Sequence, residues 1–206
     1  KLALYTEIKG EMIFQPNGWA IWSNIQKELD QRFKKYGILN VALPSFIKMS
    51  EFTKEKEHIE GFAPETFLVT HIGNKPLEES YILRPTSEVV FCYYFKKILS
   101  SYNDLPIKYN QWCNVFRAEK TTRPFLRTSE FFWHELHTLH ATQIEAEEQA
   151  ITMINEYYDF VTKFLCIPVL KGEKTEGERF AGAEHTFTIE AIMRDGQALQ
   201  CGTSPY

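Results

Sequence analysis

Residues 117–137 limit how this chain can fold more than any other stretch, because charged and aromatic side chains recur there at every second position. Side chains along a β-strand alternate between its two faces. A β-hairpin over this stretch would place on one face the odd-numbered residues Arg117, Glu119, Arg127, Phe131, Trp133, Glu135 and His137. Such a mixed face is costly to bury unless a ligand binds there. The pattern therefore predicts a ligand-binding hairpin, and an exposed hairpin with surface ion pairs is the alternative.

The composition is that of a folded domain. With 206 residues, 44% of them hydrophobic, the chain fits one large domain or most of one. A net charge of -4 and a pI near 5.9 argue against a generic basic nucleic-acid coat. The four cysteines form no CxxC pair, so we expect reduced thiols. No apolar run reaches the roughly 20 residues that a bilayer requires, and no signal-peptide pattern is present. We expect a soluble, cytoplasmic protein without membrane contact.

Periodic apolar residues predict several helices. One covers residues 19–36 and ends at Gly37, and another covers residues 87–102. Thr142 and Glu145 form a capping-box pattern ahead of a long helix that runs to about residue 165. A short charged helix is predicted over residues 53–59.

Strands are predicted between these helices. Residues 38–47 indicate an edge or interface strand that contains Pro44. Residues 67–72 and 79–83 flank a turn at 73–76, and residues 186–193 and 198–201 flank a tight turn at 195–196. Helices and strands alternate without regular βαβ units, so the predicted class is α+β with a largely antiparallel sheet.

Five sequence strings, in order along almost the whole chain, carry a family resemblance. They are RPTSE at 84–88, NQWCNVFRAE at 110–119, PFLRTSEFFWHELHT at 124–138, GERFAGAEHTFTIEA at 177–191 and ALQCGTS at 198–204. In this respect the chain resembles the prolyl-tRNA synthetases, in their eukaryote- and archaeon-like form. The resemblance implies a class II aminoacyl-tRNA synthetase catalytic domain over residues 1–206, an antiparallel sheet flanked by helices.

Amino-acid activation brings a carboxylate to the α-phosphate of ATP, so cations must stabilise the charge that develops. Arg117 matches the family's arginine that bridges these two anions, and its planar fork suits both. The resemblance also assigns Glu119 to the adenine end of ATP, Arg127 to phosphate and Phe131 to stacking on adenine. Thr128 is expected to add a polar contact.

A proline pocket needs carboxylate acceptors for the secondary ammonium and an apolar wall for the ring. Thr86 and Glu88 match the family's TxE pair, although the same residues also suit an ordinary helix start. The WxExH wall is matched by Trp133, Glu135 and His137. Phe62 matches a ring that lines the site, and a core phenylalanine is an equally good interpretation.

Further ATP contacts are implied for Gln200 and Thr203, with Gln200 near the magnesium ion. Mg²⁺ is expected to arrive with ATP, because phosphates and water supply most of its ligands. Glu190 and Gly202 are expected to shape this region. In the family that this chain resembles, the region near residue 171 lies close to the acceptor end of tRNA. We therefore hypothesise that Lys171, Lys174 and Arg179 contact tRNA phosphates.

Two other patterns are better explained without a ligand. His134, His137 and His140 recur every third residue, but this string is HExH on a predicted strand and places consecutive histidines on opposite faces, so no metal site is predicted. Residues 171–175 lack the glycine spacing of a phosphate loop, and a mobile, solvated loop is expected there.

The chain also departs from the family pattern. Ala118 and Ser129 replace a usual tryptophan and arginine, and Pro205 stands where a histidine commonly lines the proline pocket. The glycine-rich third motif and the anticodon-binding domain are absent from this sequence, so the chain is expected to be an incomplete core. The interval between His137 and Lys171 leaves no room for the bacterial-type editing insertion.

The predicted function is a proline-tRNA ligase that forms prolyl-adenylate from L-proline and ATP and transfers the prolyl group to the 3′ end of tRNA(Pro). Residues 19–36 and the strand with Pro44 correspond to the family's first motif, so a homodimer is expected. The alternative for that segment is a helix packed on its own sheet. Two other functions remain open: a non-catalytic synthetase-like module that binds tRNA or protein, and a class II enzyme for another small amino acid.

Overall fold

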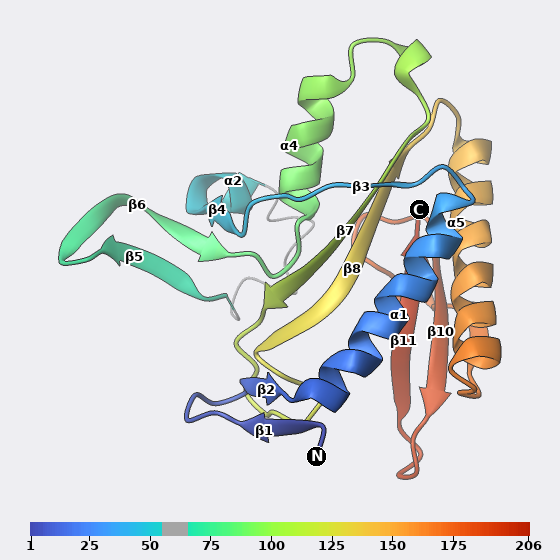
Figure 1. Cartoon of the computed structure of the whole chain (residues 1–206). Helices are drawn as coiled ribbons and strands as arrows, with labels where there is room; N and C mark the ends of the chain where they lie inside the picture. The colour runs from blue at the N-terminus through green and yellow to red at the C-terminus, as the bar shows by residue number, and fades with distance from the viewer. Residues whose placement is uncertain (55–65) are drawn as a thin grey trace. The chain divides into compact units, whose positions relative to one another are not determined.

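A computed structural model describes residues 1–54 and 66–206 of the chain (Figure 1). The predicted site residue Phe62 and part of the predicted helix 53–59 lie outside the described residues. The described residues form two compact units, each of which is treated on its own below. Unit 1 consists of residues 1–104 and 108–137, and unit 2 consists of residues 105–107 and 138–206.

Two long neighbouring strands form the centre of unit 1. These are β7 (Ile107–Phe116) and β8 (Glu130–Leu139), which lie in a sheet of order β3-β7-β8. The short strand β3 (Leu39–Asn40) runs parallel to β7, with Leu39 opposite Tyr109. The hairpin predicted over residues 117–137 is right only for its second strand, because residues 130–137 lie in β8 while β7 ends at Phe116 and residues 117–129 form a long connection.

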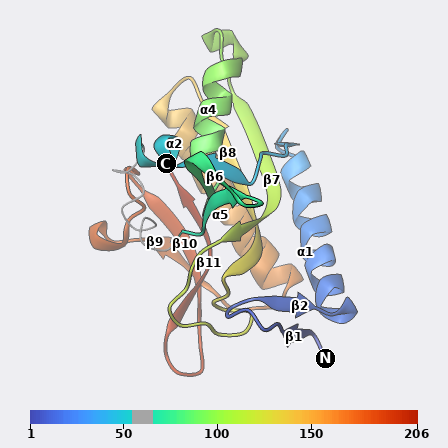
Figure 2. The ribbon, with the colours of Figure 1, turned by 90° about the vertical axis from the view of Figure 1, so that its left-hand side faces the viewer.

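Helices cover both faces of these strands (Figures 1 and 2). Helix α1 (Pro16–Lys34) packs on the even-numbered face, where the ring of Trp112 lies 5.8 Å from Trp22 and 6.2 Å from Phe33. Helix α4 (Glu88–Ile98) packs on the odd-numbered face, where Phe91 stacks on His137 at 4.2 Å. The odd face of β7 and β8 is thus covered by α4 at its His137 end.

The N-terminal hairpin, β1 (Ala3–Tyr5) and β2 (Met12–Phe14), supports the 117–129 connection. Gly10 has a φ of +83°, and its carbonyl accepts a hydrogen bond from the Ser129 N–H at 2.8 Å. A Cβ atom at Gly10 would lie 2.3 Å from Ser129 Oγ. Glycine is therefore required here both by the backbone conformation and by the close approach of the two segments.

A second sheet of unit 1 has the order β4-β6-β5, formed by β4 (Phe46–Lys48), β6 (Lys75–Leu83) and β5 (Leu68–Ile72). Strands β5 and β6 form the predicted hairpin, which turns through Gly73 at a φ of +59°. Helix α2 (Met49–Lys54) contributes Phe52 to a small core with Ile47, Ile82 and Val89.

The single strand predicted over residues 38–47 is wrong, because the structure divides it into β3 and β4. Pro44 lies between them and has no N–H for a strand ladder. The peptide groups of the neighbouring Leu43 bond to side chains instead: Gln111 Oε1 accepts from the Leu43 N–H, and Arg84 Nη1 donates to the Leu43 carbonyl.

Unit 2 places one long helix on a small antiparallel sheet. Helix α5 (Gln143–Asp159) begins at Thr142 with the predicted capping box and continues into a π-helical segment, Phe160–Phe164. The sheet has the order β11-β10-β9, with β9 (Leu170–Glu173), β10 (Thr186–Ile192) and β11 (Ala198–Pro205). Ser204 in β11 donates a hydrogen bond to the Ala150 carbonyl of α5 at 2.9 Å.

Several boundaries differ from the sequence prediction, including the start of α1 at Pro16 and the end of β11 at Pro205. The predicted helix 87–102 ends at Ile98, and the chain continues through a 3₁₀ turn at Tyr102–Asp104; a second such turn occurs at Glu176–Glu178 in unit 2. The loop predicted over residues 171–175 is wrong for residues 171–173, which lie in β9 and pair with β10. That pairing depends on a distant segment, which local sequence does not reveal. Among the described helices, none has both the length and the apolarity for a membrane span.

Candidate active site

The carboxylate of Glu135 is the centre of a buried hydrogen-bond cluster in unit 1. Its Oε1 atom accepts from Thr86 Oγ1 at 2.6 Å and from the Ser87 N–H at 2.7 Å. The thiol of Cys113 lies 3.7 Å from the other oxygen. Strand β8 supplies Glu135, and the turn before α4 supplies Thr86, so the structure brings together two residues separated by 49 positions in the sequence. The short distances are typical of hydrogen bonds to a charged carboxylate.

Arg117 lies beside this cluster, between two aromatic rings. Its guanidinium carbon is 5.3 Å from the ring centre of Phe131 and 5.1 Å from that of Trp133. The two rings meet edge to face at 5.6 Å. The Nε–H of Arg117 donates to the Pro85 carbonyl at 3.1 Å. The carbonyl and the rings orient a cation whose planar fork suits carboxylate and phosphate oxygens.

The remaining ATP-site candidates of unit 1 lie in or next to the 117–129 connection. Exposed Arg127 donates from Nη1 to Glu119 Oε2 at 3.4 Å, so the structure pairs these two residues with each other. The hydroxyl of Thr128 donates to the Glu130 carbonyl at 2.7 Å. In this structure Thr128 thus stabilises the entry into β8.

Glu88 is the first residue of α4, as expected of an acidic residue in the first helical turn. Its backbone N–H donates to Thr86 Oγ1 at 3.3 Å, so Thr86 serves both this helix start and Glu135. The structural and the ligand-binding interpretations of the TxE pair are therefore compatible in the same turn.

Burial shifts the acidity of two neighbours of Glu135. The pKa of the Cys113 thiol rises to about 11, mainly through burial and then through the charge of Glu135. Burial also lowers the pKa of His137, and the Glu135 carboxylate partly opposes that shift. Near neutral pH the Cys113 thiol and the His137 imidazole beside Glu135 are therefore uncharged.

His134 lies on the opposite face of β8, as the alternation predicts. Its ring lies 4.9 Å from that of Phe33 in α1, and its Nδ1 donates to Asn110 Oδ1 at 3.0 Å. Asn110 in turn donates to Asn40 Oδ1 at 2.9 Å, and Asn40 donates to Asp30 Oδ1 at 2.6 Å. His140 hydrogen-bonds with Thr138 in unit 2. No group of three or more His, Cys, Asp or Glu side chains within residues 1–54 and 66–206 could hold a metal ion.

The candidates of unit 2 lie in its sheet and the segment that connects β9 to β10. Gln200 Oε1 accepts from Lys174 Nζ at 2.7 Å, Thr203 pairs opposite Thr188, and Pro205 pairs opposite Thr186. Lys171 Nζ donates to Asn155 Oδ1 at 2.6 Å. Glu190 accepts a hydrogen bond from the Thr188 hydroxyl at 3.1 Å. The Nε–H of Arg179 is buried and makes no hydrogen bond. A Cβ atom at Gly202 would make only ordinary van der Waals contacts.

Four residues that support the Glu135 cluster were not predicted from the sequence. They are Arg84, Ser87, Gln111 and Cys113. The Gln111 amide donates to Ser87 Oγ at 2.8 Å and is almost fully buried. The available signal was its position: Gln111 is a polar residue on the same face of β7 as Val115, where an apolar residue would normally be buried.

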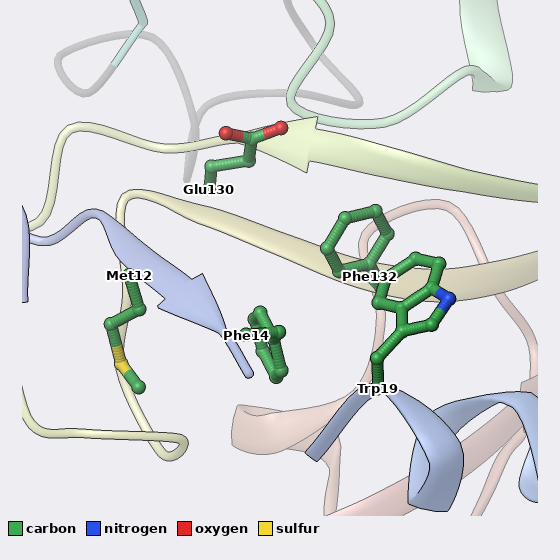
Figure 3. A pocket seen from close by; sticks show the side chains of 5 residues that line it. All are labelled: Met12, Phe14, Trp19, Glu130 and Phe132. Carbon is green, nitrogen blue, oxygen red and sulfur yellow. The ribbon is translucent and has the colours of Figure 1, made fainter. Parts of the chain in front are cut away.

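A separate open pocket lies on the even face of unit 1 (Figure 3). Its lining residues are Met12, Phe14, Trp19, Glu130 and Phe132. Phe14 and Trp19 each meet Phe132 edge to face, at 5.8 and 5.2 Å. Because Glu130 and Phe132 point away from the odd face, this pocket is distinct from the Glu135 cluster.

Known proteins resemble this chain along nearly its full length. A relative from Ureaplasma urealyticum named proline–tRNA ligase is 62% identical over 206 residues, which is 100% of this chain and 44% of that protein. A relative of the same name from Lachnoclostridium phytofermentans is 58% identical over 204 residues, 99% of this chain and 43% of that protein. The chain thus spans less than half the length of the curated relatives that it matches.

A solved structure gives the same result for the fold. Prolyl-tRNA synthetase from Cryptosporidium parvum, in complex with halofuginone and AMPPNP, matches with a TM-score of 0.93 and 38% sequence identity, over 98% of this chain and 40% of that one. The family model for the class II tRNA synthetase core domain (G, H, P, S and T) matches residues 67–204. The predicted α+β class II fold is confirmed, and the chain belongs to the class II tRNA synthetase core domain family.

Proposed function

We propose that residues 1–206 form part of the catalytic core of a proline–tRNA ligase, which joins L-proline to AMP from ATP and transfers the prolyl group to the 3′ end of tRNA(Pro). The observation that carries this proposal is the Thr86–Glu135 pair beside Arg117, at 2.6 Å in a buried turn. A carboxylate next to a cation and aromatic walls matches the charges and the ring of proline. The names of the relatives at 58% and 62% identity support the same substrate.

In the proposed proline site, the secondary ammonium faces the carboxylates of Glu88 and Glu135, and the carboxylate of proline faces Arg117. Trp133 and the uncharged His137 form the wall for the ring. Thr86 holds Glu135 in place through its hydroxyl, so the acceptor is oriented before proline arrives. The peptide N–H of Ser87 donates to the same oxygen and fixes the carboxylate further.

In the proposed ATP site, Arg117 stabilises the negative charge that develops as the proline carboxylate attacks the α-phosphate. Pyrophosphate leaves as the new acyl–phosphate bond forms. Phe131 stacks on adenine, Glu119 accepts from its exocyclic amine, and Arg127 contacts phosphate. For Arg127 this requires the 3.4 Å pairing with Glu119 to open or to be shared with the nucleotide.

Gln200 and Thr203 are retained as proposed ATP contacts from the resemblance. We expect Mg²⁺ to be carried in by the phosphates of ATP. The amide oxygen of Gln200 is a ligand type that Mg²⁺ accepts, and Lys174 holds it at 2.7 Å in this structure. The nucleotide AMPPNP in the Cryptosporidium parvum protein supports the use of ATP by this family.

A homodimer and a cytoplasmic location are also part of the proposal. Helix α1 packs on β7 and β8 through Trp22 and Phe33, yet Trp19 and Ile21 keep 44% and 51% of their surface exposed. Exposed apolar residues on the family's first-motif helix suit contact with a second copy.

The test is ATP–pyrophosphate exchange with proline, alanine, threonine and glycine. It is run on the 206-residue chain and on a hybrid in which this chain replaces the matching segment of the Ureaplasma urealyticum relative. We expect exchange with proline, and weaker exchange with alanine, because one or two methylenes in an apolar pocket discriminate by only about 1–3 kcal/mol.

Each outcome of this assay points to a different function. Exchange in the hybrid alone would mean that the 206 residues need the rest of the enzyme. Exchange that responds to another amino acid and not to proline would indicate a class II enzyme of different specificity. A folded hybrid without any exchange would contradict the enzymatic proposal and favour the binding module.

A further inference from the structure

Arg84 is a buried cation directly before the proposed proline site. Only 4% of its surface is exposed. It follows β6 and precedes Pro85, Thr86 and Ser87, the turn that carries the Glu135 contacts. A guanidinium at this depth is stable only if its N–H groups find acceptors, so its partners define its role.

The hydrogen bonds of Arg84 join two segments that flank this turn. Nη1 donates to the Leu43 carbonyl at 2.7 Å, and Nε donates to the Asn114 carbonyl at 2.9 Å. Nη2 donates to Asn114 Oδ1 at 3.2 Å. The planar fork therefore spans from the 43–45 segment to β7.

The side chain of Asn114 extends this contact to an acid. Its Nδ2 donates to Glu130 Oε1 at 2.6 Å, so the amide lies between the guanidinium and a carboxylate on β8. In these partly buried surroundings the hydrogen bonds fix the geometry of each member. The buried charge of Arg84 is thereby coupled to both central strands.

The backbone of Arg84 and its neighbour continues the link towards the reacting groups. The Arg84 carbonyl accepts from the Phe116 N–H at 3.0 Å, and the Pro85 carbonyl accepts from Arg117 Nε at 3.1 Å. Any shift of the 84–85 peptide would move the acceptor that orients the Arg117 guanidinium. It would also move Thr86 against Glu135.

We propose that Arg84 is a positioning residue for amino-acid activation, which acts by holding the Pro85 carbonyl where it orients Arg117. This inference rests on the proposed function, and it assigns to Arg84 a role through Arg117 and no contact with substrate. A lysine cannot replace it, because a point charge on a flexible stem cannot span acceptors on two segments as the rigid fork does.

The experiment measures proline-dependent ATP–pyrophosphate exchange in the hybrid enzyme with Arg84→Lys. We expect the exchange kcat to fall on the order of 10- to 100-fold, the size of effect that a small misplacement of a catalytic group produces. Arg194→Lys, in the exposed turn between β10 and β11, is the matched control and leaves kcat unchanged.

The decisive comparison repeats Arg84→Lys in an Arg117→Lys background. If Arg84 acts through Arg117, Arg84→Lys lowers kcat by less than about 3-fold in this background, because the guanidinium that it positions is already gone. Losses that multiply would overturn the inference, since a purely structural residue damages both backgrounds equally. Circular dichroism confirms that each variant is folded.

Asn114→Ala is the second variant, used if Arg84→Lys does not fold. It removes one acceptor of Arg84 and leaves the Asn114 carbonyl in place. We expect a smaller loss of kcat that also fails to multiply with Arg117→Lys. An unmodified hybrid without exchange would overturn the proposed function together with this inference, whereas an active hybrid with multiplying losses would overturn this inference alone.

Discussion

The two faces of strands β7 and β8 are both rich in polar groups, yet they differ in how those groups are used. On the even face, His134, Asn110 and Asn40 form a chain of hydrogen bonds that ends at Asp30 of helix α1. On the odd face, Glu135 is held by a hydroxyl and a peptide N–H, beside the Arg117 cation and its aromatic walls.

The difference shows how one strand can carry stability and chemistry at alternate positions. The even-face groups are bonded to one another beneath α1, so their interactions contribute to folding. The odd-face groups hold a cation and a carboxylate in fixed orientations, and these two charges complement a charged ligand. Substitutions on the odd face should therefore reduce activity, and those in the even-face chain from His134 to Asp30 should reduce stability.

The largest expected effect is that of Arg117→Ala. Loss of one preorganised donor to the developing charge lowers kcat by about 10²- to 10³-fold, or roughly 3–4 kcal/mol. Exchange of pyrophosphate in the hybrid enzyme measures this. A thermal melting curve close to that of the unmodified hybrid is expected, and a large loss of stability would mean that the two faces do not divide as described.

The next effect is a dependence of stability on pH that comes from the even face. Burial lowers the pKa of His134 to about 4, with a contribution from the charge of nearby His137. The unfolded chain then binds more protons than the folded chain between pH 6.5 and 4, so stability decreases as the pH falls through this range. The loss from His134 is at most about 3 kcal/mol.

Urea unfolding at several pH values measures this decrease. His134→Gln should flatten it, with His137 supplying the remaining slope in the same direction because burial lowers its pKa as well. His71→Gln, which removes an exposed imidazole on β5, is the matched control. An unchanged slope in His134→Gln would show that the even face does not contain the titrating group.

Glu135→Gln should produce a smaller effect, on proline binding. The substitution keeps the shape and one acceptor but removes the charge that is proposed to face the proline ammonium. Hydrogen bonds to charged groups contribute about 1.5–3 kcal/mol, so the KM for proline should rise roughly 10- to 100-fold. The KM for ATP serves as the internal control, and an equal rise in both would contradict the proposed role.

Asp30→Asn should produce the smallest effect and should act on stability alone. Burial raises the pKa of Asp30, but hydrogen bonds from Lys34, Asn40 and Trp112 outweigh burial and lower this pKa overall. The folded state therefore favours the charged form of Asp30. Removing that charge should cost about 1 kcal/mol of unfolding free energy and leave both KM values unchanged. A change in exchange kinetics would show that the two faces are coupled.

Sequence patterns predicted the parts of the fold that depend on local chemistry. Thr142 and Glu145 signal a helix start by themselves, and the alternation along residues 131–137 assigns His134 and His137 to opposite faces. Side-chain periodicity and capping act within a few residues, so a single sequence contains them.

The supporting residues of the site could not be predicted in the same way. Arg84 was noted only as the first residue of the string RPTSE. Its role depends on the carbonyls of Leu43 and Asn114, which come together only through folding. Strand β9 was likewise missed, because it exists only through its pairing with β10. Long-range contacts such as these carry no local signature.

The strict alternation along β8 has a consequence for how this protein can change over evolutionary time. Insertion or deletion of one residue between Phe131 and His137 would exchange the two faces at once. It would direct Glu135 towards α1 and His134 towards the proposed proline site, and would therefore disrupt both the packing under α1 and the proposed site in a single event. Insertions and deletions should therefore be confined to the 117–129 connection, while β8 accepts only substitutions.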